Sequence, residues 1–166
     1  SGFGTVMTTG DMNSDGKPDL IVGAKDYSSG AGRVHVFYSD GSLTTGATSA
    51  DIVITGEAAS NYFGSALATG DFNADGRVDL VVGAYSYGSG SGRVYLFYND
   101  GSFPTAAASA DVTIAGELAS ALGIALATGD LNADGKTDLA VGGYYYSGNY
   151  TGRVYIFYND GSIPTA

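Results

Sequence analysis

Carboxylates crowd together at three places in a chain that has few charged residues. Asp71–Asp79 reads DFNADGRVD, and closely related stretches occur at Asp11–Asp19 and Asp130–Asp138. Like charges a few ångströms apart repel one another and raise one another's pKa unless a positive group lies between them. The three acidic loops therefore predict bound cations.

The spacing within each loop indicates which cation would bind. The pattern places side-chain oxygens at loop positions 1, 3, 5 and 9 and a backbone carbonyl at position 7, while the glycine at position 6 permits a sharp bend. Hard oxygen donors without histidine or cysteine select calcium over transition metals, and a flexible shell of about 6 to 8 oxygens favours calcium over magnesium. We predict three Ca²⁺ sites with side-chain ligands Asp11, Asn13, Asp15 and Asp19, then Asp71, Asn73, Asp75 and Asp79, then Asp130, Asn132, Asp134 and Asp138. The predicted backbone ligands are the carbonyls of Lys17, Arg77 and Lys136.

Two other interpretations of these loops explain less. An EF-hand needs a bidentate glutamate at loop position 12, where this chain has Val22, Val82 or Val141, and it needs a helix where a strand is expected. Asp, Asn and Gly also populate ordinary turns that bind no metal, but three copies at one offset favour a shared ligand set. Calcium at a hairpin turn is mainly structural, so we expect it to rigidify the turn.

The acidic loops belong to three copies of one longer unit. The offset is 60 residues from Asp11 to Asp71 and 59 from Asp71 to Asp130, and GRVHVFYSDGS, GRVYLFYNDGS and GRVYIFYNDGS follow at the same offset. A fixed period of this kind indicates a repeat architecture. We place the units at residues 1–60, 61–119 and 120–166.

Each complete unit predicts four strands. The first two form a hairpin whose turn is the acidic loop, and a Gly/Ser loop precedes the third strand. Four antiparallel strands in about 60 residues are typical of one β-propeller blade. No stretch has the pattern of an amphipathic helix, and Glu117–Ala127 is expected to be a turn followed by a strand. In the second unit the strands are expected at Phe63–Asp71, Asp79–Tyr85, Gly92–Tyr98 and Ala110–Glu117.

The predicted fold class is all-β, with three four-stranded antiparallel repeats as propeller blades. The third repeat stops at Ala166, before any copy of ADVTIAGE, and is expected to lack its outer strand, with nothing before Ser1 to supply it. Three blades are fewer than the roughly four to eight that close a ring. We expect a fragment, a partial propeller, or a ring completed by oligomerisation. Gly152–Asn159 would then be an edge strand open to a strand from another chain.

The chain resembles the FG-GAP repeats of integrin α-subunit β-propellers over nearly its whole length. The resemblance rests on the acidic loops together with Phe3-Gly4, Phe63-Gly64, Gly23-Ala24 and Gly83-Ala84. The third unit departs from it at Leu122-Gly123 and Gly142-Gly143, and no unit has the proline that ends the GAP element. These departures touch no predicted calcium ligand.

The resemblance implies a ring of blades with calcium in the hairpins on one face and ligands on the other face. Ligands in the family engage loops that join the second to the third strand and the fourth to the first. Similar repeats occur in bacterial and archaeal surface proteins, in fungal lectins and in extracellular enzymes whose catalysis is elsewhere. An extracellular or cell-surface location is the expectation for this chain.

Tyrosines gather in the loops between the second and third strands, where the units differ most. A tyrosine offers an apolar ring to a sugar or side chain and a hydroxyl for hydrogen bonding. The alternative is that these rings pack between blades or at a subunit interface. The candidate ligand-binding residues are Tyr27, Tyr85, Tyr87, Tyr144, Tyr145, Tyr146 and Tyr150. In the third loop, Asn149 begins NYT, an N-glycosylation acceptor pattern.

Arginine opens the third strand of each unit, at Arg33, Arg93 and Arg153. Anion recognition is one interpretation, but repetition at a strand start favours structural ion pairs, with Glu57 and Glu117 as candidate partners. The only histidine, His35, takes the place of a tyrosine in the other units and is expected to be part of the scaffold.

Composition narrows the classes of function. The 166 residues contain 17 acidic and 7 basic side chains and no cysteine, with a formal charge of −10, which argues against nucleic acid or an anionic membrane as partner. Three divalent cations would reduce that charge to −4. The longest apolar run is too short to span a bilayer.

The prediction is a calcium-binding FG-GAP module of an extracellular or cell-surface protein that acts in adhesion or self-assembly and is not an enzyme. The chain offers no coherent nucleophile and base. Its expected partners are other copies of itself or a strand from another chain, and a protein or glycan ligand. The alternatives are a lectin-like glycan-binding module and a non-catalytic accessory domain of a secreted hydrolase.

Overall fold

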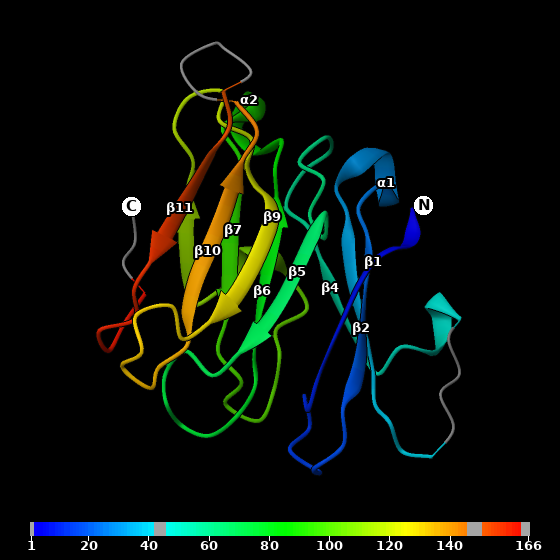
Figure 1. The fold of residues 1–166 in the computed structure, drawn as a ribbon. Helices are drawn as coiled ribbons and strands as arrows, with labels where there is room; N and C mark the ends of the chain where they lie inside the picture. Colours follow the sequence, from blue (N-terminus) through cyan, green and yellow to red (C-terminus); the bar gives the residue numbers. More distant parts are fainter. Residues whose placement is uncertain (1, 42–45, 146–150, 164–166) are drawn as a thin grey trace.

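The computed structural model describes residues 2–41, 46–145 and 151–163, and its strands form three antiparallel sheets in chain order (Figure 1). The all-β class and the missing outer strand of the third repeat are confirmed over these residues. The first sheet contains β1 (Phe3–Gly10), β2 (Asp19–Ala24), β3 (Arg33–Phe37) and β4 (Ile52–Thr55). The second contains β5 (Ala66–Gly70), β6 (Asp79–Ala84), β7 (Arg93–Phe97) and β8 (Val112–Ala115). The third contains β9 (Leu122–Gly129), β10 (Asp138–Gly143) and β11 (Arg153–Phe157).

Each sheet is a meander, in which every strand pairs with its neighbour in the chain. The β1–β2, β5–β6 and β9–β10 hairpins end on the same kind of pair, a glycine opposite the last aspartate of the acidic loop. These pairs are Gly10↔Asp19, Gly70↔Asp79 and Gly129↔Asp138. Because the register is identical, the three acidic loops leave their sheets in the same way.

Short turns occupy the connections that the sequence predicted as loops. They are α1 (Tyr27–Gly30), α2 (Tyr87–Gly90), η1 (Ala47–Ser49) and η2 (Ala107–Ser109). The interior residues of α1 and α2 have positive φ, so these two are not regular helix. The turns α1 and α2 lie at the end of the sheets opposite the acidic loops (Figure 1). None of the helices in the described residues has the length and apolarity needed to cross a membrane.

The first strand of the second sheet begins later than predicted, at Ala66 instead of Phe63. The backbone N–H groups of Gly64 and Ser65 both donate to the carbonyl of Gly83, at 3.0 and 3.2 Å, so regular pairing starts only after them. Phe63 instead forms a parallel bridge with Gly32 of the preceding sheet.

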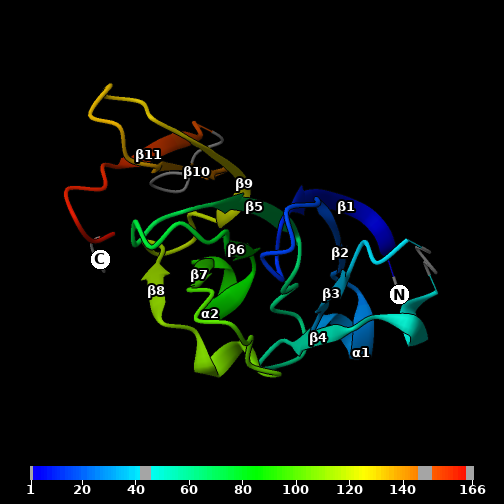
Figure 2. The same ribbon diagram turned by 90° about the horizontal axis from the view of Figure 1, so that it is seen from below.

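The three sheets fan out from their first strands as the blades of a propeller do. Strands β1, β5 and β9 lie side by side, and the later strands diverge from them (Figure 2). A threonine on β5 joins that strand to β1, and a threonine on β9 joins that strand to β5. Thr69 Oγ1 donates to the carbonyl of Thr9 at 2.9 Å, and Thr128 Oγ1 donates to that of Thr69 at 2.8 Å.

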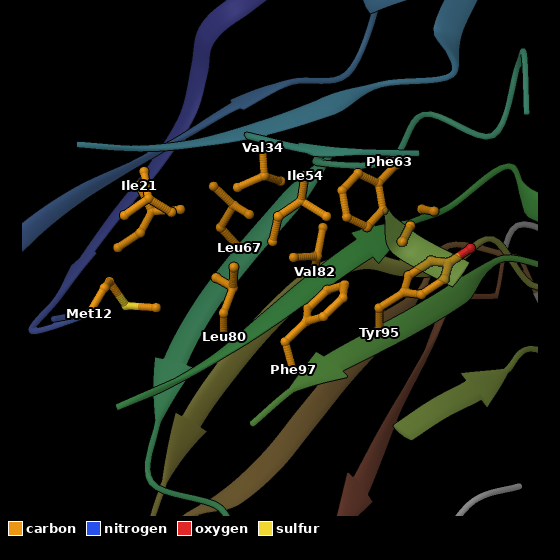
Figure 3. Close-up of a cluster of buried hydrophobic side chains, with 13 residues drawn as sticks. Met12, Ile21, Val34, Ile54, Phe63, Leu67, Leu80, Val82, Tyr95 and Phe97 are labelled. Carbon is orange, nitrogen blue, oxygen red and sulfur yellow. The ribbon is translucent and has the colours of Figure 1, made fainter. Parts of the chain in front are cut away.

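The hydrophobic core lies between the blades. Figure 3 shows side chains of the first sheet facing side chains of the second. The first blade contributes Met12, Ile21, Val34 and Ile54, and the second contributes Phe63, Leu67, Leu80, Val82, Tyr95 and Phe97. A second cluster joins the second and third blades in the same way. Alternate residues of β7 therefore face opposite neighbours, with Tyr95 and Phe97 in the first cluster and Val94 and Leu96 in the second.

Glycines explain how closely the blades approach. A Cβ added to Gly23 would overlap the carbonyl of Gly64, and one added to Gly83 would overlap the carbonyl of Gly123. The two short motifs therefore meet across the boundary between blades. The glycine of the GA motif in one blade packs against the glycine at the FG position of the next blade.

Candidate metal sites and loop surface

The three acidic loops share a strained backbone. The glycine at loop position 6 has a φ of +84° in every copy, at Gly16, Gly76 and Gly135. No atom lies within 4 Å of the position of a Cβ there, so glycine is required by the backbone conformation and not by space. Position 4 is also left-handed although it is never glycine, with φ near 60° at Ser14, Ala74 and Ala133.

The first three predicted side-chain ligands gather around the amides of the loop. In the second blade the N–H of Asp75 donates to Asp71 Oδ1 at 3.2 Å and to Asn73 Oδ1 at 3.1 Å. The N–H of Gly76 donates to Asp71 Oδ2 at 2.9 Å, and that of Arg77 donates to Asp75 Oδ1 at 2.8 Å. The same four bonds occur in the first and third blades.

The fourth predicted ligand lies at the base of each loop and is fully buried, at Asp19, Asp79 and Asp138. Asp79 Oδ2 accepts the N–H of Phe72 and Oδ1 accepts that of Asn99, both at 2.8 Å. Burial raises the pKa of Asp79, and the charges of Asp75 and Asp71 add to that rise, while the two amide donors oppose it. The aspartate therefore closes the hairpin by binding amides of two different segments.

The donor set fits a hard cation in its chemistry. Each loop offers three carboxylates and one amide oxygen, and a carboxylate oxygen that accepts one amide keeps a second lone pair. In the described part of the chain, however, no group of three or more His, Cys, Asp or Glu side chains is placed to hold a metal ion. Calcium binding and the backbone ligands Lys17, Arg77 and Lys136 stay predictions.

Two asparagines that the sequence analysis did not single out connect the acidic loops of neighbouring blades. Asn99 Nδ2 donates to the carbonyl of Met12 in the first loop at 3.0 Å, and Asn159 Nδ2 donates to that of Phe72 in the second loop at 2.8 Å. Both asparagines are buried. The signal was present in the turn sequence, which is NDG in the second and third units and SDG in the first.

The predicted ion pair is found at Arg93. Its Nη1 lies 3.2 Å from Glu57 Oε1 of the preceding blade, and the hydroxyl of Tyr95 donates to the same oxygen at 2.9 Å. Burial, followed by this bond to Glu57, raises the pKa of Tyr95. Arg33 differs, since its Nε donates to Thr55 Oγ1 at 3.2 Å. Glu117 lines a hollow of about 240 Å³ beside Tyr155.

The tyrosine loops lie at the opposite end of the blades. The guanidinium carbons of Arg33 and Arg93 lie 3.7 and 3.6 Å from the ring centres of Tyr27 and Tyr87. Tyr85 stacks on Tyr62 with ring centres 5.2 Å apart.

Farther along the chain, Tyr144 meets Tyr145 edge to face, with ring centres 4.7 Å apart. The five tyrosine candidates in the described loops thus all pack against another side chain, and their contact with a ligand stays a prediction. Tyr146, Asn149 and Tyr150 lie outside the described residues.

One hollow at this end opens between the second and third blades. It has a volume of about 260 Å³ and contains Tyr85 and Tyr145 together with the hydroxyls of Ser86 and Ser89. Aromatic faces beside hydroxyl groups suit a ligand that is partly apolar and partly polar.

His35 lies in the scaffold, away from the acidic loops. Its ring meets Phe3 edge to face with centres 5.3 Å apart, and it is buried. Burial lowers the pKa of His35, the charge of Arg33 lowers it further, and a backbone hydrogen bond at Ala47 partly offsets both.

Three blade-like sheets with an acidic hairpin loop in each define a segment of a β-propeller that carries repeated candidate cation loops. A family model described as "FG-GAP-like repeat" matches residues 11–82 and 71–141. Since these matches span more than half of the sequence, the chain belongs to the FG-GAP-like repeat family.

The relatives of this chain are much longer proteins. Phosphatidylinositol-glycan-specific phospholipase D of Mus musculus is 37% identical over 95% of this chain and 20% of its own length. Integrin alpha-PS2 of Drosophila melanogaster is 33% identical over 99% of this chain and 12% of its own length. Integrin alpha-3 of Mus musculus is 40% identical over 64% of this chain and 10% of its own length. The chain thus spans a fifth or less of the length of these three relatives.

Proposed function

We propose that this chain is a calcium-binding FG-GAP module of an extracellular or cell-surface protein, that it acts in adhesion or self-assembly, and that it has no catalysis of its own. The observation that carries the proposal is the repetition of one loop. Three blades present the same Asp, Asn and Gly residues with the same φ values and the same amide contacts, at one end of the sheets. Uncharged Asn or Ser acceptors could cap the amides of such a turn, so three mutually repelling carboxylates in each copy favour a bound cation.

The proposed role of calcium is to stiffen the hairpins that position the blades. A cation among Asp71, Asn73 and Asp75 would balance carboxylates that otherwise repel one another around the buried Asp79. The loop is joined to the next blade through Asn159, so order in the loop supports the packing between the blades. The integrin names among the relatives support an adhesive setting.

Isothermal titration with calcium tests the proposal. We expect uptake of one ion per loop, weaker uptake of magnesium, and a melting temperature that falls when EDTA is added. Asp75→Ala should remove one site and leave the other two. Absence of any calcium uptake would overturn the proposal.

A lectin-like glycan-binding role is the second candidate, and the hollow that contains Tyr85 and Tyr145 favours it. A pyranose ring stacks on tyrosine while its hydroxyls bond to serine. Screening on a glycan array, repeated with Tyr85→Ala and Tyr145→Ala, tests this role, and an array without signal would exclude it for the sugars present.

An accessory role in a secreted hydrolase is the third candidate. It rests on the similarity to phospholipase D, of which this chain matches only a fifth. The test is an assay of the chain for release of phosphatidylinositol-glycan-anchored protein from vesicles. We expect no release, and activity of the chain by itself would overturn the non-catalytic part of the proposal.

A further inference from the structure

We propose that the hollow between the second and third blades binds the aromatic ring of a tyrosine or phenylalanine side chain on a protein partner. The proposal rests on the proposed adhesive function and names the chemical class of the contact. The hollow lies beside α2, at the end of the sheets opposite the acidic loops (Figure 1). Tyr85, Gly90, Ala119, Ala121 and Tyr145 are among the residues that line it.

The boundary between the first and second blades shows what fills the equivalent space. There the ring of Tyr62 lies over Gly30, so that a Cβ added to Gly30 would lie 3.0 Å from Tyr62 Cε1. This ring stacks on Tyr85, with ring centres 5.2 Å apart and an angle of 2° between the ring planes. The Nζ of Lys25 lies 5.4 Å from the centre of the Tyr62 ring. An aromatic ring of the chain itself therefore fills the first boundary.

The second boundary has the same backbone but lacks the ring. The N–H of Tyr62 donates to the carbonyl of Gly30 at 2.7 Å, and the N–H of Ala121 donates to that of Gly90 at 2.8 Å. Tyr62 and Ala121 are both left-handed, with φ of +56° and +50°. Ala121 thus stands where Tyr62 stands one blade earlier. No atom of the described residues lies within 4 Å of a Cβ added to Gly90, so the space that is filled over Gly30 is open over Gly90.

The size and lining of the hollow suit one aromatic side chain. Its volume is about 260 Å³, below the roughly 300–1,000 Å³ of pockets that hold drug-sized molecules. Tyr85 follows the GA motif of the second blade as Lys25 follows that of the first. A ring in the hollow therefore meets the aromatic face of Tyr85 where Tyr62 meets the ammonium group of Lys25.

Two observations favour an aromatic side chain over a sugar. The chain places a planar ring in the equivalent space, and that ring is stacked face to face on a tyrosine. In addition, Leu118 is 84% exposed in the loop that lines the hollow, where the preceding boundary has Ala58. An exposed leucine suits the apolar side chains of a protein partner better than the hydroxyl-bearing edge of a sugar.

Nuclear magnetic resonance titration of the isotope-labelled chain in calcium tests the proposal. The probes are acetylated and amidated Gly-Ser-Xaa-Ser-Gly peptides in which Xaa is tyrosine, phenylalanine, leucine or alanine. We expect the amide signals of Gly90 and Ala121 to shift with the tyrosine and phenylalanine peptides, with a dissociation constant of about 1 mM. The leucine and alanine peptides should bind about 10-fold more weakly, because they cannot stack.

Three variants locate the contact. Ala121→Tyr places a ring of the chain in the hollow and should abolish peptide binding, while the fold is kept because Tyr62 already adopts the same backbone. Ala108→Tyr, at an exposed position on η2, is the matched control and should bind as the parent does. Tyr62→Ala is the reverse change. It empties the first boundary, so the tyrosine peptide should also shift the amide signal of Gly30.

Several results would overturn the proposal. They are no shifts with the aromatic peptides at about 10 mM, equal binding of the leucine peptide, or undiminished binding to the Ala121→Tyr variant. Methyl glycosides of glucose and mannose are titrated in parallel, and shifts of Gly90 and Ala121 with a glycoside but not with tyrosine would overturn it in favour of the glycan-binding role. Calorimetric uptake of calcium by a chain that binds no aromatic peptide would leave the proposed calcium function intact.

Discussion

The side chain of Asn99 donates a hydrogen bond to the backbone carbonyl of Met12, 87 residues earlier and in the neighbouring blade, at a distance of 3.0 Å. The backbone N–H of the same residue donates to Asp79, at the base of its own acidic loop. One buried residue therefore touches two acidic loops, and Asn159 repeats the arrangement with Phe72 and Asp138.

Removing the side-chain hydrogen bond from Asn99 to Met12 should weaken the packing between the first two blades and lower the stability of the protein. Asn99→Ser introduces the residue that the first unit has at Ser39 and leaves the carbonyls of Met12 and Val78 without their donor. We expect a loss of about 1–3 kcal/mol in the free energy of unfolding, measured with urea in calcium. Ser39→Asn is the matched control, because the described residues hold no acidic loop of a preceding blade for an asparagine at this position to reach. Equal stability of the two variants would contradict the role of the bridge.

Variants at Asp79 and Asp75 should separate what the acidic loop contributes to folding stability from what it contributes to metal binding. Asp79→Asn replaces an acceptor that faces two buried amides, so we expect a loss of about 2–3 kcal/mol even in EDTA. Asp75→Asn alters a more exposed acceptor and should cost less in EDTA. Titration with calcium should show one ion fewer for each variant. Equal urea midpoints in EDTA would be inconsistent with this division of roles.

Substitutions at the two left-handed positions of an acidic loop should change the stability of the protein in opposite directions. Gly76→Ala puts a side chain at a φ of +84° and should cost about 1–2 kcal/mol. Ala74→Gly relieves a φ of +59° and should raise stability by up to about 1 kcal/mol. Neither change removes a predicted ligand. Thermal unfolding in EDTA measures both effects, and a stabilising Gly76→Ala would refute the assigned backbone strain.

His35 should make the protein less stable in mild acid. The fold lowers the pKa of His35, whereas the unfolded chain protonates it near its ordinary value of about 6.5. Below that pH the unfolded state binds a proton that the native state does not, so stability is lost as the pH falls. His35→Phe removes the only histidine and should flatten the stability curve between about pH 7.5 and pH 5. Urea midpoints over that range, taken in saturating calcium, check this, and parallel curves would contradict it.

The repeat and its strands could be predicted from the sequence because their signals are local. Alternating apolar residues in GRVYLFY indicate a strand by themselves, and the spacing of aspartates in DFNADGRVD indicates a tight turn with oxygen donors. The late start of β5 was not predictable in this way. It depends on Gly64 and Ser65 sharing the carbonyl of Gly83, which is a contact between two strands.

The sequence by itself determined three repeated units, which show in the offsets of 60 and 59 residues between the acidic loops. It also determined the hairpin at each acidic loop and the residue types available for a cation, since these depend on residues close together in the chain. Only the tertiary structure decided which residues join the blades. Asn99 reaches Met12, Glu57 reaches Tyr95 and Gly83 receives Gly123 across distances in sequence that no local pattern encodes. It also decided that Val94 is buried while Val154 is exposed, because burial depends on the presence of a neighbouring blade and not on the residue itself.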